Sequence, residues 1–196
     1  MKCVVGIDEV GRGPLAGPVS VAAVAIEKRF YEEILGEFKD LKDSKKTSAN
    51  LREKWLKKID KFPKSIFYSV SLVGNIAIDK KGIVRAIEIS LSRSLGKLDL
   101  KPDKCEVLLD GSLRAPKKFK NQKTIIRGDE KEKIIAMASI VAKVYRDKHM
   151  KRQSKIFPLY GFEKHKGYGT KEHIKKIKKY GASDIHRLSF LNNLKF

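Results

Sequence analysis

The chain begins with short apolar runs, and later stretches have apolar residues recurring every three or four positions. Apolar runs that are continuous or alternating predict strands, because successive side chains of a strand point to opposite faces. Such runs cover residues 4–7, 19–26, 65–72, 106–109 and 124–126. Helical periodicity covers residues 51–59, with Ser48 as the N-cap, then 83–95, 131 to about 155, and 171–179.

The order of these elements predicts the fold class. Strands mostly precede helices but alternate with them only in part, which is typical of an α/β fold with a mixed sheet. We expect one domain over residues 1–196, in which a basic helical extension from about 156 to 196 packs on the rest.

The charge balance points to a polyanionic partner. The chain has 44 Lys and Arg against 23 Asp and Glu, a formal net charge of +21, and 41% hydrophobic residues are enough for a core. A basic protein gains affinity for nucleic acid by releasing the counterions condensed on phosphates. A membrane surface, an acidic protein, or simple solubility are the alternatives; the one-sided excess of cations favours nucleic acid.

The cysteines and the N-terminus bear on the compartment. Cys3 and Cys105 are far apart and lack the paired spacing of a zinc site, which favours a reducing compartment. The first residues run straight into a motif, and no apolar run reaches the ~20 residues of a membrane span. We therefore expect a cytoplasmic monomer with no membrane partner.

Acidic residues follow three of the predicted strands. Asp8 and Glu9 end the first, Asp110 ends the fourth, and Asp129 follows the fifth. Strand ends of an open α/β sheet converge where ligands bind, and gathered carboxylates repel unless cations lie between them. Oxygen ligands suit Mg²⁺ or Mn²⁺ rather than zinc. The alternative is that each Asp merely starts a turn.

One geometric condition applies to the first pair of acids. Asp8 and Glu9 are adjacent, so on a regular strand their side chains point to opposite faces. They can share a metal ion only if the pleat breaks there. We expect the glycines and proline at 11–14 to break it.

The segment around these acids resembles a known family. Residues 6–19, GIDEVGRGPLAGPV, resemble ribonuclease HII, the bacterial type 2 ribonuclease H. Further matching segments are LKDSKK at 41–46, DG at 110–111, RGD at 127–129, the helix at 135–147, YGFEKHKGYGT at 160–170, and IHR at 185–187. Residues 75–87 depart from the family pattern, as do Thr47, Arg127 and Met137 at single positions.

The resemblance implies a ribonuclease H-like fold, with a five-stranded mixed sheet flanked by helices and a helical C-terminal extension. It implies an endonuclease that hydrolyses the RNA strand of RNA/DNA hybrids and nicks 5′ of ribonucleotides embedded in duplex DNA. The products are a 3′-hydroxyl and a 5′-phosphate, and the roles implied are primer removal and ribonucleotide repair. Carried over by position, Asp8, Glu9, Asp110 and Asp129 are the catalytic ligands of two Mn²⁺ or Mg²⁺ ions. One ion generates the attacking hydroxide and the other stabilises the leaving oxygen.

Recognition of RNA requires contact with the 2′-hydroxyl, which both donates and accepts hydrogen bonds. The backbone of Gly11, Arg12 and Gly13 lies close in sequence to the acids and is suited to this contact. Tyr168 stands between two glycines, where its ring can stack on a sugar or base. The alternative is a core tyrosine, although the charged residues before it make a poor core.

The long helix predicted from residue 131 divides into faces. Ile134, Ala138, Val141 and Tyr145 form an apolar stripe, whereas Ser139, Lys143 and Arg146 form a second stripe suited to phosphate contacts. A solvated cationic face is the alternative. Further phosphate candidates are Lys45, Lys46, His186 and Arg187, and His173 is interpreted as a surface residue of its helix.

The two cysteines have matching positions relative to the acids. Cys3 lies five residues before Asp8, and Cys105 lies five before Asp110. If those strands are parallel neighbours with level acids, the cysteines are level too, about 5 Å apart. We expect free thiols, because such disulfides are strained and the compartment is reducing.

Two other classes of protein share some of these features. A non-catalytic nucleic-acid-binding protein accounts for the charge but not for the acids at the strand ends. Another metal nuclease, such as a resolvase, accounts for the acids but not for the Gly-Arg-Gly and Gly-Tyr-Gly loops. The ribonuclease HII interpretation accounts for all of them.

Overall fold

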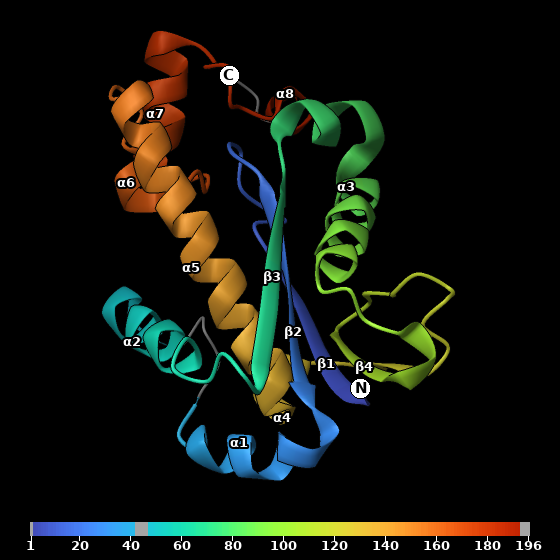
Figure 1. Ribbon diagram of the computed structural model, residues 1–196. Helices are drawn as coiled ribbons and strands as arrows, with labels where there is room; N and C mark the ends of the chain where they lie inside the picture. Colours follow the sequence, from blue (N-terminus) through green and yellow to red (C-terminus); the bar gives the residue numbers. More distant parts are fainter. Residues whose placement is uncertain (1, 42–46, 193–196) are drawn as a thin grey trace.

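A computed structural model describes residues 2–41 and 47–192, which form a five-stranded mixed sheet flanked by helices (Figure 1). The strands are β1 (Cys3–Val10), β2 (Val19–Glu27), β3 (Ile66–Val73), β4 (Cys105–Asp110) and β5 (Gln122–Ile125). Their order across the sheet is β3-β2-β1-β4-β5. The first three are antiparallel, whereas β4 runs parallel to β1 and β5 parallel to β4. The predicted fold class is confirmed.

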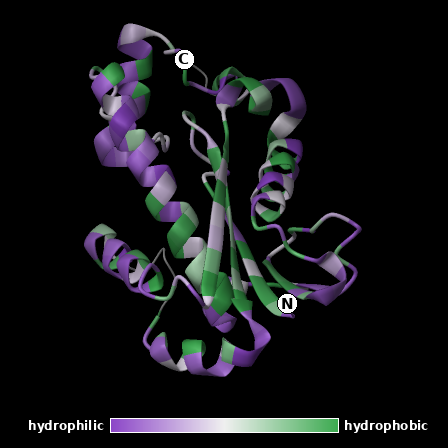
Figure 2. Cartoon of the chain, viewed as in Figure 1, coloured by the Kyte–Doolittle hydropathy of each residue, from purple (hydrophilic) through white to green (hydrophobic). Residues whose placement is uncertain are grey.

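Helices cover both faces of the sheet (Figure 1). The long helix α5 (Lys133–Ile156) crosses one face, beside α1 (Tyr31–Glu37) and α2 (Ala49–Ile59), and α3 (Asn75–Lys97) covers the other. Each face has its own apolar cluster, and the central strands β1 and β2 are mostly hydrophobic in Figure 2. The shorter helices are α4 (Gly128–Lys131), α6 (Phe162–His165), α7 (Lys171–Tyr180) and α8 (Leu188–Leu191), with 3-10 turns η1 (Lys28–Phe30) and η3 (Pro102–Lys104).

Helix α3 begins eight residues before the predicted start. It includes Gly82, whose φ of 78° and ψ of 158° are not helical, so the backbone kinks there. The glycine interrupted the helical pattern in the sequence, and only the regular part after it was predicted. Helix α1 was not predicted at all, and β5 ends at Ile125, which leaves Ile126 exposed.

Two helix starts follow from their capping residues. The hydroxyl of Ser48 accepts a hydrogen bond from the backbone N–H of Leu51, which confirms the predicted N-cap of α2. Thr170 caps α7 in the same way, through the N–H of His173. No helix in the described ranges is long and apolar enough to cross a membrane.

The register of β1 and β4 places the two cysteines side by side. Cys3 pairs with Cys105 across the parallel strands, as the spacing predicted, and both are buried free thiols with Sγ atoms 2.9 Å apart. Burial and the neighbouring thiol raise the pKa of Cys3 to about 12. The Cys3 thiol therefore stays protonated at neutral pH.

The C-terminal segment packs on the end of α5 through a third apolar cluster. Met150 of α5 meets Leu15 and Ala16 of the loop after β1, together with Phe162 and Ile177 of α6 and α7. This shared cluster supports the proposal that residues 156–196 extend a single domain. It also brings the loop after β1 against the C-terminal segment, next to the acids at the end of β1.

Candidate active site

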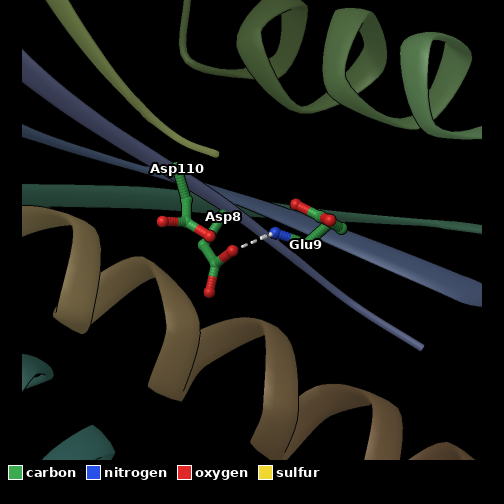
Figure 3. Close-up of side chains that lie close together, drawn as sticks. All are labelled: Asp8, Glu9 and Asp110. Atoms are coloured by element: carbon green, nitrogen blue, oxygen red, sulfur yellow. Dashed lines mark hydrogen bonds between the residues drawn. The ribbon is translucent and has the colours of Figure 1, made fainter. Parts of the chain in front are cut away.

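Three carboxylates gather where β4 ends beside β1. The β4 pairing with β1 runs through Ile7 and Leu109, whereas β1 continues beside β2 as far as Val10. Oxygens of Asp8, Glu9 and Asp110 all lie within 4.8 Å of one another. Figure 3 shows the three side chains together, with Asp8 directed toward α5.

The predicted break in the pleat is wrong. Glu9 pairs with Val21 and Val10 with Ser20, so β1 is regular through both acids. The carboxylates of Asp8 and Glu9 nevertheless come together with that of Asp110, just beyond the last pair between β1 and β4. The Glu9 N–H also donates to Asp8 Oδ1 at 2.7 Å.

The electrostatics of Asp8 fit a site for a cation. Its side chain is 1% exposed, and burial, followed by the charges of Glu9 and Asp110, raises its pKa well above the usual 3.8. The neighbouring Ser139 hydroxyl and the Glu9 N–H oppose this rise. Asp8 Oδ2 is buried and accepts no hydrogen bond of good geometry from the described residues. A divalent cation would satisfy that oxygen and offset the repulsion.

Asp129 belongs to a segment that contacts Asp110, but it is not one of the three carboxylates within 4.8 Å. It is buried in α4, and the preceding Gly128 donates its N–H to Asp110 Oδ1 at 2.6 Å. Arg127 before it has a φ of 56°, a left-handed conformation that turns the chain from β5 into α4. The Arg-Gly-Asp segment is therefore attached to the cluster through the glycine amide.

The two glycines of the Gly-Arg-Gly loop have different surroundings. Gly11 is buried with a φ of 94°, and a Cβ there would lie 2.2 Å from Nε of Arg146. A Cβ on Gly13 would meet no atom within 4 Å, and Arg12 between them is exposed. Gly11 is thus required by packing inside the protein, whereas Gly13 faces open space suited to a ligand.

Arg146 and Arg187 do not face phosphate, which corrects the prediction for both. Each is fully buried, and their guanidinium groups donate only to backbone carbonyls among the described residues. Ser139 is also fully buried, beside Asp8 rather than at the surface. The second stripe of α5 therefore faces the interior, apart from Lys143. Helical spacing could not show this, because the loop after β1 covers that face.

His173 and His186 are buried too, which corrects the surface position predicted for the first and the phosphate contact predicted for the second. The Ser183 N–H donates to His186 Nδ1 at 2.8 Å, so the proton of His186 is on Nε2. Nε2 lies 3.1 Å from Nε2 of His173, whose Nδ1 then donates to the Tyr168 carbonyl at 2.9 Å. Two neutral histidines thus connect the Tyr168 loop to the C-terminal segment.

Tyr168 lies at the surface, 40% exposed, beside cations. Nζ of Lys143 is 5.8 Å from the centre of its ring and 2.9 Å from Oδ1 of Asp147. A cavity of about 250 Å³ next to them is lined by the cations Arg52, Lys143, Lys148, Lys151, Lys164 and Lys166. Most of these were missed from the sequence, although Lys143, Asp147 and Lys151 share a helical i, i+4 spacing. The predicted contacts Lys45 and Lys46 lie outside the described residues.

Comparisons with known proteins place the chain in a family. A family model described as Ribonuclease HII matches residues 5–193. The ribonuclease HII of Caldicellulosiruptor bescii is 46% identical over 194 residues, which are 98% of this chain and 88% of that protein. The ribonuclease H2 of Pyrococcus horikoshii OT3 has a TM-score of 0.73 at 26% identity, covering 95% of this chain and 93% of that one. The fold is also shared by a structure of Bst-RNase HIII in complex with Mn2+, with a TM-score of 0.69. That structure is 18% identical in sequence, and the match covers 97% of this chain and 68% of that one.

Proposed function

The chain belongs to the ribonuclease HII family and is a ribonuclease H endonuclease, and we propose that it cuts RNA in hybrids with DNA and nicks 5′ of single ribonucleotides in duplex DNA. The cut leaves a 3′-hydroxyl and a 5′-phosphate. One observation carries the proposal: the carboxylates of Asp8, Glu9 and Asp110 lie together at the end of β1, directly before the exposed Arg12 and Gly13. The carboxylates that would bind the metal ions and the backbone groups that would contact the ribose thus lie next to each other.

The residues at this site fit divalent cations, and we propose Mn²⁺ or Mg²⁺, two ions during catalysis. Asp8, Glu9 and Asp110 would hold them, with Asp129 completing the set from α4. The ligands are oxygens only, and Asp8 Oδ2 is buried with no hydrogen bond of good geometry in the described part of the chain, although the Ser139 hydroxyl lies nearby. When bound, such ions activate water and stabilise the charge on the leaving oxygen.

The protein's own residues orient the reacting groups. The Gly128 amide holds the Asp110 carboxylate, and the Glu9 amide holds that of Asp8, so both are fixed before substrate binds. Tyr168 is suited to stack on a sugar or base, and the lysines around it are suited to the phosphates. No side-chain nucleophile is needed in this scheme.

We also propose that the enzyme works as a cytoplasmic monomer with nucleic acid as its partner. The net charge of +21 and the cations beside Tyr168 support the partner, and the small number of cysteines, Cys3 and Cys105 alone, favours a reducing compartment. Light scattering at working concentrations tests the oligomeric state. A mass of two chains would contradict it.

The activity is tested with a DNA duplex that contains one ribonucleotide, incubated with Mg²⁺ or Mn²⁺. We expect wild-type protein to nick 5′ of the ribonucleotide, and we expect Asp8→Asn or a chelator to abolish the nick. Asp103→Asn, which changes an exposed carboxylate before β4, is the matched control and should retain activity. Tight binding without any metal-dependent nick would instead favour a non-catalytic binding protein.

A further inference from the structure

We propose that Arg187 is a positioning residue that orients two consecutive peptide N–H groups, those of Arg12 and Gly13, outward to donate to the ribose 2′-oxygen. The inference rests on the proposed function, because it concerns how that site distinguishes ribose from deoxyribose. The selectivity of the loop for ribose over deoxyribose would thus depend on a buried arginine that is 175 residues away from Arg12 in the sequence.

Arg187 binds both carbonyls of the loop with one planar group. Its Nη2 donates to the Gly11 carbonyl at 2.7 Å, Nη1 donates to that of Arg12 at 2.9 Å, and Nε donates to that of Gly17 at 2.9 Å. A guanidinium presents its N–H groups in a rigid fork, so it fixes the direction of both carbonyls at once. A lysine at this position would keep the charge but not the fork.

The direction of the carbonyls determines the direction of the amides. In a trans peptide unit the carbonyl of one residue and the N–H of the next point in opposite directions, and the described chain has no cis peptide bond. Because the carbonyls of Gly11 and Arg12 point inward to Arg187, the N–H groups of Arg12 and Gly13 point outward. No residue in the described ranges accepts a hydrogen bond from either N–H. The open space around Gly13 is where an acceptor can approach.

A second buried arginine holds the rest of the loop. Arg146 donates to the carbonyls of Ala16, Pro18 and Lys166, at 3.2, 2.9 and 3.0 Å. Its Cζ lies 5.7 Å from the centre of the Tyr168 ring. Arg146 therefore joins the loop after β1 to the Tyr168 loop, and Arg187 orients its tip.

This arrangement is costly for stability, which supports a role in function. Burial, together with the nearby charge of Arg146, lowers the pKa of Arg187 to about 9, and burial also lowers that of Arg146. All six hydrogen bonds go to carbonyls rather than carboxylates, so the two charges are only partly compensated. Apolar packing would stabilise the fold better than two buried cations. What the arginines provide is a fixed direction for the backbone groups.

The test compares binding of two DNA duplexes that are identical except for one ribonucleotide, with Ca²⁺ in place of Mg²⁺ so that neither is cut. Selectivity is the Kd for the all-DNA duplex divided by the Kd for the ribonucleotide duplex. We expect Arg187→Lys to lower selectivity about tenfold, which corresponds to losing roughly 1.4 kcal/mol from two hydrogen bonds. Its Kd for all-DNA duplex should stay within about twofold of wild type, since the phosphate contacts are elsewhere.

The control for lost stability is Leu95→Ala, which removes a buried side chain from the α3 cluster and leaves the loop untouched. It should lower the melting temperature and leave selectivity unchanged. A wild-type selectivity in Arg187→Lys would overturn the inference. If that variant does not fold, Arg187→Gln takes its place, because its amide cannot donate to both carbonyls, and it should lower selectivity in the same way. In ¹⁵N-labelled protein the amide signals of Arg12 and Gly13 should shift more with the ribonucleotide duplex than with the all-DNA duplex in wild type, and equally with both in the Arg187 variant that folds. Equal shifts with both duplexes in wild type, or a wild-type difference kept in the Arg187 variant, would overturn it.

The two proposals fail separately. A protein that never nicks the ribonucleotide duplex, but whose preference for it falls in Arg187→Lys, would contradict the proposed function and support the inference. Wild-type protein that nicks normally, while the two amides respond equally to both duplexes, would do the reverse.

Discussion

The side chain of Arg146 occupies the space that a Cβ on Gly11 would need, since that atom would lie 2.2 Å from Arg146 Nε. Gly11 is therefore a packing residue, and its φ of 94° adds a second reason for glycine. Gly13 has neither constraint, although both glycines belong to one motif. Sequence alone does not separate these two roles, because the partner of Gly11 comes from α5.

This difference predicts opposite effects for the two alanine variants. Gly11→Ala should lower the free energy of unfolding by about 1–3 kcal/mol, through overpacking and backbone strain. Gly13→Ala should stay within about 0.5 kcal/mol of wild type, yet lower kcat/KM on a ribonucleotide duplex, because the new methyl group meets only the substrate. Denaturant unfolding and nicking assays measure the two quantities. Equal stability of the two variants would contradict the assignment.

The buried carboxylate of Asp8 predicts how stability depends on pH and metal. Its pKa is higher in the folded than in the unfolded protein, so the folded state favours the protonated form. The metal-free protein should therefore lose stability as pH rises above about 4 toward the raised pKa. Asp8→Asn should melt at a higher temperature than wild type in chelator at pH 8, where each kcal/mol corresponds to about 2–4 °C.

The metal response provides the control for this prediction. Adding Mn²⁺ should raise the melting temperature of wild type, because the ion binds only the folded carboxylates. The rise should be much smaller in Asp8→Asn and unchanged in Asp103→Asn. If Asp8→Asn is less stable than wild type in chelator, the charged Asp8 carboxylate does not destabilise the metal-free fold and the prediction is contradicted.

The paired cysteines predict a particular pattern of alkylation. Both thiols are 2% exposed and thus shielded from reagents, and the pKa of Cys3 is about 12, so Cys3 forms almost no thiolate at pH 8. A thiol reagent should leave the native protein unlabelled over hours and add two labels in denaturant without reductant. Intact mass measures both. Absence of labels in denaturant would mean that the pair is oxidised to a disulfide.

Most of the fold could be predicted, because it depends on local patterns. The five strands follow from apolar runs, and even the level position of Cys3 and Cys105 follows from counting to the acids. Helix α1 and the first part of α3 were missed, the latter because Gly82 breaks the period. The spacing of apolar residues shows which face of a helix is buried only while the helix is regular. At the kink in α3 the buried face shifts, so the spacing before Gly82 no longer matches the spacing after it.

The interior of the site was harder to predict, because charge alone does not show what a residue contacts. Arg146, Arg187 and His186 suggested phosphate ligands in a basic chain, yet all three are buried against segments distant in sequence. Their acceptors are backbone carbonyls and a second histidine, and no sequence pattern reveals such partners. The closeness of Asp8, Glu9 and Asp110 could be predicted because strand ends meet at a common edge, whereas Asp129 is not within 4.8 Å of them.

The neutral histidine pair predicts a loss of stability in mild acid. Burial lowers the pKa of His173 and of His186 from 6.5 to about 4, so the unfolded chain binds protons before the folded protein does. Stability should fall as pH drops from about 6.5 toward 4, by about 2 kcal/mol for each histidine at pH 5. Because each added proton would face an N–H donor, the pair cannot adapt by exchanging tautomers.

Unfolding by denaturant at pH 7.5, 6.5 and 5.5 measures this loss. His173→Gln and His186→Gln should each be less stable than wild type at pH 7.5 but lose less stability on acidification. A pH slope identical to that of wild type in both variants would assign the acid sensitivity to other groups.

The cations beside Tyr168 predict the salt dependence of binding. Lys148 and Lys151 are exposed on the last turns of α5 and line the cavity next to Lys143. If each contacts one phosphate, its removal should weaken binding of all duplexes alike and reduce the slope of log K against log salt by about 1. Lys104→Ala is the matched control, because it lies just before β4, at the opposite end from Asp110. Fluorescence anisotropy between 50 and 300 mM salt gives the slopes, and the prediction fails if Lys148→Ala and Lys151→Ala behave like Lys104→Ala.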